Sequence, residues 1–221
     1  MNNTIGVLGL GLFGTSVART LAGVNVDVIA MDMNMDHVEE VVDEVAVAVQ
    51  GDFTKFDQLA QAGFGDCDQV VIASAERLEN TILAILNLKK LNVTDITVKT
   101  KNKDYREVLL KVGATRVILP EVEMGVQVAN MLANPTVHEL MSLDNRYNII
   151  EFPTSHSWVG KTIIEIDFRN KYDINIIAIQ PTDSTDYTIE FKPSYTVSEG
   201  DIFIGVTTDA GRQRLLKITQ N

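Results

Sequence analysis

Residues 4 to about 119 alternate short runs rich in β-branched side chains with segments whose hydrophobic residues recur at helical spacing. Such runs are typical of buried strands, and their alternation with helices is typical of a parallel sheet covered on both faces. The sequence therefore predicts an α/β domain built on a doubly wound parallel sheet. We expect its strands at 4–9, 26–31, 45–49, 69–74, 95–100 and 116–120, and its helices at 12–22, 36–44, 54–62, 77–90 and 104–112.

After residue 120 a single hydrophobic stripe predicts one more helix, at 121–133. The stripe is formed by Val122, Val126, Ala129 and Leu132. Asn134 and Pro135 end this helix, because proline cannot continue it.

Beyond about residue 146 the alternating runs become shorter and are punctuated by Gly and Pro. This pattern predicts a second, smaller α+β domain that is mainly β, with one or two helices, one of them near 161–168. We expect strands at 148–152, 174–179, 187–191 and 201–206. The predicted domains are therefore 1–134 and 135–221, with 134–147 as the connection.

Composition excludes several classes of protein. The net charge is −11, with an acidic excess in both predicted domains, so a nucleic-acid polymer is a poor candidate partner. No apolar run approaches the roughly 20 residues of a membrane-spanning helix, and the start lacks the basic region of a signal peptide. We expect a cytosolic protein.

Metal and thiol chemistry find little support. Cys67 is the only cysteine, which excludes an intrachain disulfide and favours a small core residue. The three histidines, His37, His138 and His156, are scattered and do not have the spacing of zinc ligands.

The stretch IGVLGLGLFG, at 5–14, places G-x-G-x-x-G between the first predicted strand and the first helix. In this position Gly9 makes a tight turn, Gly11 lets the backbone approach a pyrophosphate, and Gly14 lets helix and strand pack closely. Asp32 ends the second strand, where a carboxylate accepts hydrogen bonds from a ribose. The pattern predicts a Rossmann-like domain with an adenosine-containing ligand; NAD, NADH, ATP and ADP all satisfy it. The alternative is a glycine turn with a purely structural role.

Two further loops should face the same crevice, because they also follow strands of the parallel sheet. Asp52 is suited to an adenine amine and Phe53 to the face of the base, unless Asp52 only caps the next helix. Ala73 and Ser74 are small enough to let a ligand lie flat, although ordinary close packing explains them equally well.

Hydride transfer needs an acid or base near the nicotinamide. No histidine follows a strand in the first 120 residues, and no Tyr-x-x-x-Lys pair occurs in the chain. We therefore expect a protein that is not an enzyme.

Several motifs together resemble the RCK (KTN) family, the cytosolic gating subunits of Ktr/Trk-type potassium uptake systems. They are GLGLFG, VIAMDMN, the Gly51-Asp52 pair and KVGATRVILPEVEMG at 111–125, the most specific of them. GKTIIEIDFRNKYDINIIAI at 160–179 and FKPSYTVSEGDIFIGV at 191–206 are similar to the signature stretches of the RCK-C (TrkA-C) domain. The resemblance spans nearly the whole chain and implies an RCK-N domain followed by a smaller RCK-C domain.

The resemblance implies a nucleotide pocket in the first domain. Lys99 would contact a phosphate oxygen, and Glu121 would approach the terminal phosphate through a divalent cation. The alternatives are a solvated lysine and a first-turn acid favoured by the helix dipole. The candidate pocket comprises Gly9, Leu10, Gly11, Leu12, Phe13, Gly14, Asp32, Met33, Asp52, Phe53, Ala73, Ser74, Lys99 and Glu121.

Two positions depart from the family's pattern. Many members have Arg where this chain has Leu12, so the preference among ATP, ADP and NAD(H) stays open. Asp173 stands where Gly often follows the Tyr, which predicts an altered turn.

The resemblance also implies a second ligand, cyclic di-AMP, at the dyad between two RCK-C domains. Arg169 would supply the cation, the isoleucines the walls, and Asp167 and Asn175 the polar contacts. The alternative is that the isoleucines belong to the core and that Arg169 pairs with Asp167. The candidate site comprises Ile163, Ile164, Asp167, Arg169, Asn175, Ile176 and Ile177.

The function implied is regulation of a membrane potassium-translocating subunit at the inner face of the cell membrane. The chain would dimerise through the helix at 121–133 and assemble into a ring, a tetramer or an octamer. A small NAD-dependent oxidoreductase is the main alternative, weakened by the missing acid–base group. A redox-sensing transcription factor is disfavoured by the acidic balance.

Overall fold

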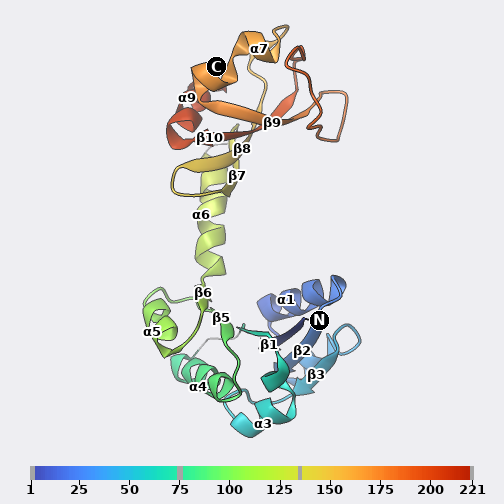
Figure 1. Cartoon of the computed structure of the whole chain (residues 1–221), viewed down its shortest axis with the longest axis vertical. Coiled ribbons are helices and arrows are strands. Elements are labelled where there is room, and N and C mark those ends of the chain that lie inside the picture. The colour runs from blue at the N-terminus through green and yellow to red at the C-terminus, as the bar shows by residue number, and fades with distance from the viewer. Residues whose placement is uncertain (1–2, 74–76, 134–135, 220–221) are drawn as a thin grey trace. The chain divides into compact units, whose positions relative to one another are not determined.

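The structure is a computed structural model that describes residues 3–73, 77–133 and 136–219 (Figure 1). It divides into two compact units, Met1–Glu123 and Met124–Asn221. Each unit has a hydrophobic core of its own.

The first unit is built on a six-stranded parallel sheet with the order β3-β2-β1-β4-β5-β6. Its order reverses beside β1, and sheets of this kind bind ligands outside the carboxyl ends of the strands at the reversal, here β1 and β4. The predicted α/β doubly wound sheet is confirmed. Its strands are β1 (Thr4–Leu8), β2 (Asp27–Asp32), β3 (Val47–Gln50), β4 (Gln69–Ile72), β5 (Asp95–Lys99) and β6 (Arg116–Ile118).

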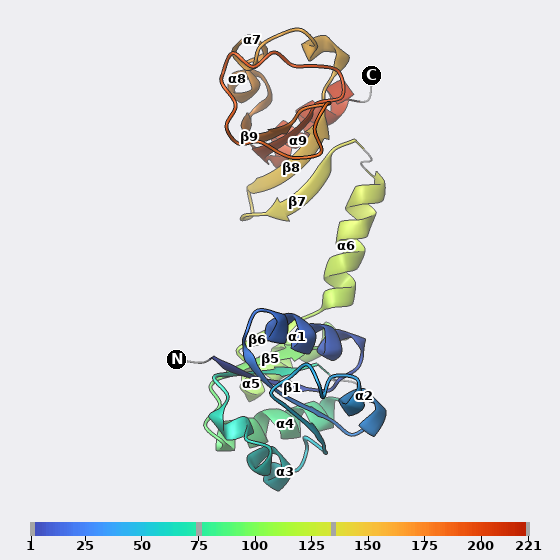
Figure 2. The same ribbon diagram turned by 90° about the vertical axis from the view of Figure 1, so that its right-hand side faces the viewer.

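Helices cover both faces of this sheet, with α1 on one side and α3 and α4 on the other (Figure 2). One core cluster contains Val7, Ala18, Ala30 and Val38 on the α1 and α2 side. A larger cluster on the other side includes Cys67, and burial raises the pKa of its thiol to about 12. The helices are α1 (Leu12–Gly23), α2 (Met35–Glu39), α3 (Phe56–Gln61), α4 (Leu78–Lys90) and α5 (Tyr105–Val112).

Helix α2 is shorter than the predicted 36–44. The Arg19 side chain, from α1, donates a hydrogen bond of 2.7 Å to the Glu40 carbonyl and one of 2.8 Å to the Glu44 carboxylate. Because the Glu40 carbonyl already accepts this hydrogen bond, it is less available to the backbone N–H group that would extend the helix. Residues 40–44 therefore form turns instead.

The second unit contains a four-stranded antiparallel sheet with the order β7-β8-β10-β9, packed against short helices. Phe152 and Phe203 stack with centroids 5.6 Å apart, and Trp158 meets Phe168 edge-on at 4.9 Å. The smaller α+β domain is confirmed. Its strands are β7 (His138–Ser142), β8 (Tyr147–Pro153), β9 (Ile174–Gln180) and β10 (Ile202–Thr208), and its helices are α7 (Ile163–Ile166), α8 (Phe168–Tyr172) and α9 (Asp209–Thr219). Helix α6 (Pro120–Ala133) precedes them in the chain.

Three expectations for this unit are wrong in detail. The predicted strand 187–191 is a loop in which Thr188 forms a single bridge with Ile179. The predicted connection 134–147 contains β7, whose side chains are mostly exposed and show little alternation. The predicted helix at 161–168 is divided into α7 and α8 by Asp167, whose φ of 56° lies in the left-handed region.

Asp173 takes the left-handed conformation that glycine usually supplies, with φ of 61°. Its carboxylate accepts a hydrogen bond of 2.6 Å from Thr208 Oγ1, and its carbonyl accepts one of 2.8 Å from Thr207 Oγ1. Asp tolerates this region better than most residues because its short side chain bonds locally. The expected alteration of this turn is therefore wrong, since the tight turn is made with Asp.

The long loop 181–200 is fastened by Asp201, which is fully buried. Its carboxylate accepts hydrogen bonds from the Thr182 N–H (3.0 Å), the Ser198 N–H (2.8 Å) and the Tyr195 hydroxyl (2.9 Å). Burial and the hydrogen bond to Asp201 raise the pKa of the Tyr195 hydroxyl to about 12. One side chain thus satisfies donors from both ends of the loop.

Asp201→Ala should destabilise the second unit by about 2–3 kcal/mol, because it leaves buried donors without an acceptor. The only tryptophan, Trp158, lies in this core, so urea unfolding followed by its fluorescence reports on the second unit. Asp186→Ala, an exposed acid in the same loop, is the matched control and should change stability by less than about 0.5 kcal/mol. Equal effects of the two substitutions would contradict the role of Asp201.

Candidate functional site

The glycine turn between β1 and α1 has the geometry that the motif predicts. Gly9 has φ of 92°, which favours glycine, and a Cβ on Gly14 would overlap the Gly9 carbonyl oxygen. A Cβ on Gly11 would meet nothing within 4 Å. Gly14 is therefore required by packing, whereas Gly11 borders open space.

The first turn of α1 is suited to an anion. In the part of the chain that the structure describes, its N-cap residue Gly11 makes no side-chain cap and the first turn carries no acid. The N-terminal N–H groups of a helix carry a partial positive charge and favour negatively charged ligands.

Asp32 is hydrogen-bonded to the glycine turn. Its Oδ2 accepts from the Leu10 N–H at 2.6 Å, and its Oδ1 accepts from the Asn34 N–H at 2.8 Å. Its side chain is 15% exposed. Each carboxylate oxygen has a further lone pair, which leaves capacity for a ribose hydroxyl.

The motif did not single out His37, which lies in α2 with its Nδ1 3.4 Å from Asp32 Oδ1. The signal in the sequence that could have identified His37 was a histidine five residues after Asp32. The buried Nδ1 makes no hydrogen bond within the described residues.

The loop after β3 contains two candidate residues, Asp52 and Phe53. The contacts of both favour a structural role over ligand binding. Asp52 Oδ1 accepts from both the N–H (2.9 Å) and the hydroxyl (2.7 Å) of Thr54, and the side-chain bond lowers the pKa of Asp52. Phe53 is buried in the core cluster of the α3 and α4 face. Asp52 caps the turn before α3, and Phe53 packs inward.

The remaining candidates of the first unit line the turn in different ways. Ala73 lies beside Gly14 and its N–H donates to the Leu8 carbonyl at 2.8 Å. Leu12 and Met33 are largely exposed, whereas Leu10 is buried. Ser74 lies outside the described residues.

Three candidate side chains from different elements lie close together: Lys99 of β5, Glu121 of α6 and Phe13 of α1. Lys99 Nζ lies 2.8 Å from Glu121 Oε1 and 5.3 Å from the centre of the Phe13 ring. The side chain of Lys99 is only 15% exposed, which disfavours a merely solvated lysine. The hydrogen bond from Lys99, the backbone N–H of Glu121 and the charges of Lys99 and Lys101 lower the pKa of Glu121.

Glu121 does not form a metal site with the other side chains that the structure describes. Among the described residues, no three His, Cys, Asp or Glu side chains are grouped to hold a metal ion. A divalent cation at Glu121 would need oxygen ligands from a bound nucleotide or from another copy.

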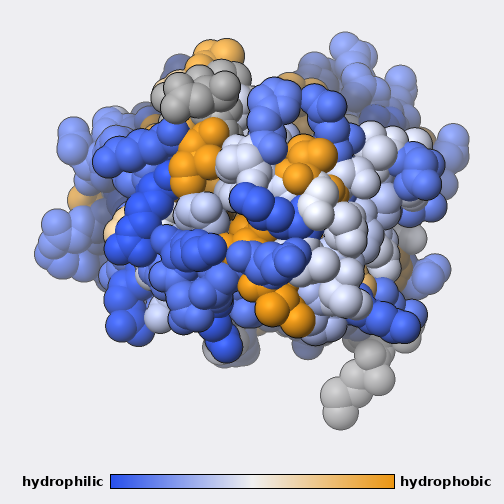
Figure 3. Space-filling view, turned by 90° about the horizontal axis from the view of Figure 1, so that it is seen from above, coloured by the Kyte–Doolittle hydropathy of each residue, from blue (hydrophilic) through white to orange (hydrophobic). Residues whose placement is uncertain are grey.

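The candidate residues of the second unit divide into a core set and an exposed set. Ile163 and Ile176 pack against the core cluster, whereas Ile164, Asn175 and Ile177 are exposed. Figure 3 shows hydrophobic residues in small patches among hydrophilic ones on this unit.

The expected alternative pairing of Arg169 with Asp167 does not form. Asp167 accepts instead from Asn170 Nδ2, at 2.8 and 3.1 Å to its two oxygens. Arg169 is exposed, and within the described part of the chain it makes no hydrogen bond or ion pair. Its guanidinium is available to an anion.

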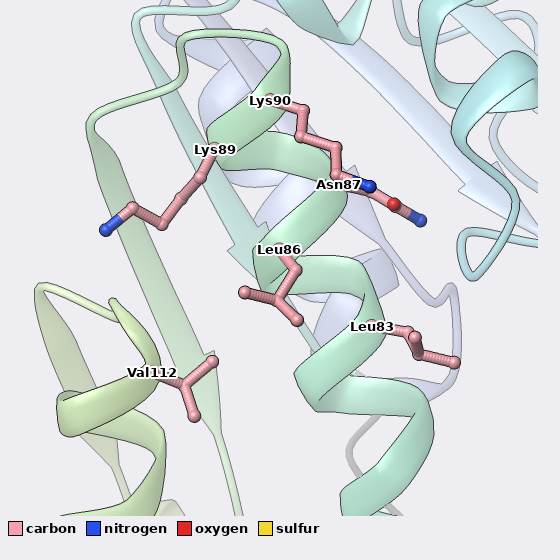
Figure 4. A pocket seen from close by; sticks show the side chains of 6 residues that line it. All are labelled: Leu83, Leu86, Asn87, Lys89, Lys90 and Val112. Atoms are coloured by element: carbon pink, nitrogen blue, oxygen red, sulfur yellow. The ribbon is translucent and has the colours of Figure 1, made fainter.

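An open groove of about 420 Å³ lies elsewhere in the first unit, between α4 and α5. Figure 4 shows Leu86 of α4 facing Val112 of α5, with Lys89 and Lys90 at the end of α4. The sequence analysis did not identify this groove, because it depends on how the two helices are spaced.

Comparison with known proteins identifies two domains in this chain. Residues 5–120 match the TrkA-N domain and residues 149–220 the TrkA-C domain. The chain is 33% identical to Ktr system potassium uptake protein C of Bacillus subtilis, over 96% of each chain, and 32% identical to protein A of the same system over 81% of each. The RCK domain of GsuK has the same fold, with a TM-score of 0.66 at 17% identity over all of this chain and 48% of that one.

Gly14→Ala should destabilise the first unit by about 1–3 kcal/mol, because the added methyl group forces apart the turn and the start of α1. Gly11→Ala, with φ of −67° and open space around it, should leave stability within about 0.5 kcal/mol of the parent. Thermal unfolding followed by circular dichroism measures both. A Gly14→Ala protein as stable as Gly11→Ala would contradict the packing argument.

Proposed function

The chain belongs to the family of potassium-uptake regulators built from a TrkA-N and a TrkA-C domain, and we propose that it is a nucleotide-sensing gating subunit of a membrane potassium-translocating protein. Its relatives are components of the Ktr potassium uptake system, which supports a regulatory role rather than an enzymatic one.

The observation that carries the proposal is the hydrogen bond from the Leu10 N–H to Asp32. It holds the N-terminal end of α1 and the Asp32 carboxylate side by side, which supports a site for the phosphate and the ribose of one adenosine nucleotide. Lys99 lies near the same helix end and supplies a cation. We infer that ATP or ADP is the natural ligand; NAD(H) satisfies the same groups.

Leu12 leaves the preference among these ligands open. It is 94% exposed at the start of α1, where a cation would contact phosphates and leucine does not. Because the described residues hold no group of three metal-binding side chains, we propose a divalent cation at Glu121 only together with phosphate oxygens of the nucleotide.

Helix α6 supports association between copies. None of its 14 residues, all of them described, is buried. Its exposed hydrophobic residues are Met124, Val126, Val128, Met131 and Leu132. A helix with this much exposed apolar surface is stabilised when a partner covers it, and a second copy offers the same helix.

A ring needs a second contact on each copy, because one surface alone closes a dimer. The groove between α4 and α5 offers it, with the exposed Leu83 and Leu86 in its lining. We propose that α6 and this groove together build a homo-oligomeric ring, a tetramer or an octamer.

Across the described residues, no helix has both the length and the apolar character required to span a bilayer. We propose a cytoplasmic protein that reaches the inner face of the membrane through its potassium-translocating partner.

The second unit is proposed to bind cyclic di-AMP where two copies meet. Arg169 is exposed and unpaired among the described residues, and Ile164 and Ile177 present apolar surface. A two-fold ligand with two phosphates and two bases needs one such set from each copy. Either ligand acts by binding two conformations of the ring with different affinity.

Asp32→Ala should abolish thermal stabilisation by ATP, ADP and NADH alike, because it removes the acceptor for the ribose hydroxyls. Thermal-shift titration measures this, and potassium flux through the partner subunit should then no longer respond to nucleotide. Asp36→Ala, four residues on and exposed, is the control. Asp32→Asn keeps one acceptor oxygen if the alanine variant unfolds. Undiminished stabilisation of both Asp32 variants, or stabilisation by NADH alone with turnover of a hydroxy acid, would contradict the proposal.

Arg169→Ala should weaken the binding of cyclic di-AMP at least tenfold and leave ATP binding unchanged, because a charge-assisted contact to phosphate is lost. Isothermal titration calorimetry with each ligand separates the two sites. Lys217→Ala, an exposed cation on α9, should leave both affinities unchanged. Full cyclic di-AMP affinity in Arg169→Ala would place the ligand elsewhere.

A further inference from the structure

His37 of α2 lies beside the carboxylate that is proposed to bind the ribose. Its Nδ1 is 3.4 Å from Asp32 Oδ1. This nitrogen is buried and makes no hydrogen bond within the described residues. The side chain as a whole is 38% exposed, so the ring exchanges protons with solvent while one of its nitrogens lies against Asp32.

Asp32 has a limited capacity to accept hydrogen bonds. An ionised carboxylate offers about four lone-pair positions, two on each oxygen. The Leu10 N–H uses one position on Oδ2, and the Asn34 N–H uses one on Oδ1. One position remains on each oxygen, and the two hydroxyls of a ribose would occupy both. A further donor to Oδ1 would therefore exclude one ribose hydroxyl.

His37 becomes such a donor when it is protonated. A neutral imidazole has one N–H, which it can carry on Nε2, whereas an imidazolium has an N–H on both nitrogens. The N–H on Nδ1 then has Asp32 Oδ1 as its neighbouring acceptor. Histidine is the side chain that ordinarily changes its charge between about pH 5 and 8.

The charged side chains of α2 and its surroundings are mainly acids. Residues 27–52 contain eight Asp and Glu and no Lys or Arg. Asp36 precedes His37, and Glu39 and Glu40 follow it. His37 is therefore the only side chain of this segment that can bring a positive charge to Asp32.

The elements packed against α2 do not supply a competing cation. Strand β3 carries no titratable side chain, and Asp52 beyond it accepts its hydrogen bonds from Thr54. Arg19 of α1 is held by the Glu44 carboxylate at 2.8 Å.

We propose that His37 is a positioning residue that makes nucleotide binding depend on pH. Its imidazolium donates to Asp32 Oδ1 and competes with a ribose hydroxyl, so the affinity for adenosine nucleotides falls as the pH falls and histidine becomes charged. The inference rests on the proposed nucleotide site. Through it, acidification of the solution weakens the response to nucleotide.

His37→Gln tests this, because glutamine is neutral at every pH used. Calorimetry with ADP should give an affinity within about twofold of the parent at about pH 8, and about 3–10-fold tighter than the parent at about pH 5.5, where the parent loses a hydrogen bond to ribose. The terminal phosphate of ADP also titrates in this range, so the quantity compared is the ratio of variant to parent affinity at each pH.

Matched measurements identify the cause. His156→Gln removes an exposed histidine of the second unit and should keep the parent's affinity at both pH values. In the parent, either 2′-deoxy-ADP or 3′-deoxy-ADP should show a smaller pH dependence than ADP, because one of them lacks the hydroxyl that His37 displaces. His37→Asn, also neutral, replaces the glutamine variant if the latter is poorly folded.

The outcomes separate this inference from the proposed function. A ratio of variant to parent affinity that is the same at both pH values would reduce His37 to a structural contact and overturn the inference, and the nucleotide site would stand. The same pH dependence for ADP and both deoxy analogues would overturn the competition for Asp32. Failure of the parent to bind ADP at either pH would overturn the proposed function as well.

Discussion

The close contact between Gly14 and the Gly9 carbonyl is the constraint on which the first unit depends. It brings the start of α1 against the end of β1, and the Leu10 N–H then reaches Asp32 at the end of β2. Because β1 lies between β2 and β4, Ala73 closes the other side of the same turn. The Asp32 carboxylate and the N-terminal end of α1 are thereby held together by backbone packing.

The Lys99–Glu121 pair extends this arrangement to α6. Glu121 belongs to the first turn of α6, a helix that buries none of its described residues. A change of charge in the crevice therefore acts on the start of an element whose apolar surface is suited to contacts between copies. In the proposed function, a ligand that favours one arrangement of the copies would act on a partner through this connection.

Much of the fold could be predicted because the strands of the first unit are short, continuous β-branched runs with a helix after each. Where the prediction of the fold failed, local side-chain bonds and backbone conformations were the cause. Arg19 occupies the Glu40 carbonyl and shortens α2, and Asp167 in the left-handed region divides the predicted helix at 161–168. The segment 187–191 alternates like a strand, but Asp201 fastens the loop that contains it, and within 187–191 only Thr188 forms a bridge. Such side-chain bonds join residues that no periodicity connects.

The candidate site, like the fold, could be predicted only in part from the sequence. The sequence by itself determined the glycine turn, the acid at the end of β2 and the two-domain order, because each follows from residue type and spacing along a strand–helix unit. Only the tertiary structure decided that Phe53 packs into the core, that His37 lies beside Asp32, and that Lys99 pairs with Glu121. Those relations depend on how α2, α3 and α6 pack around the sheet, and packing brings together residues whose separation along the chain carries no periodic signal.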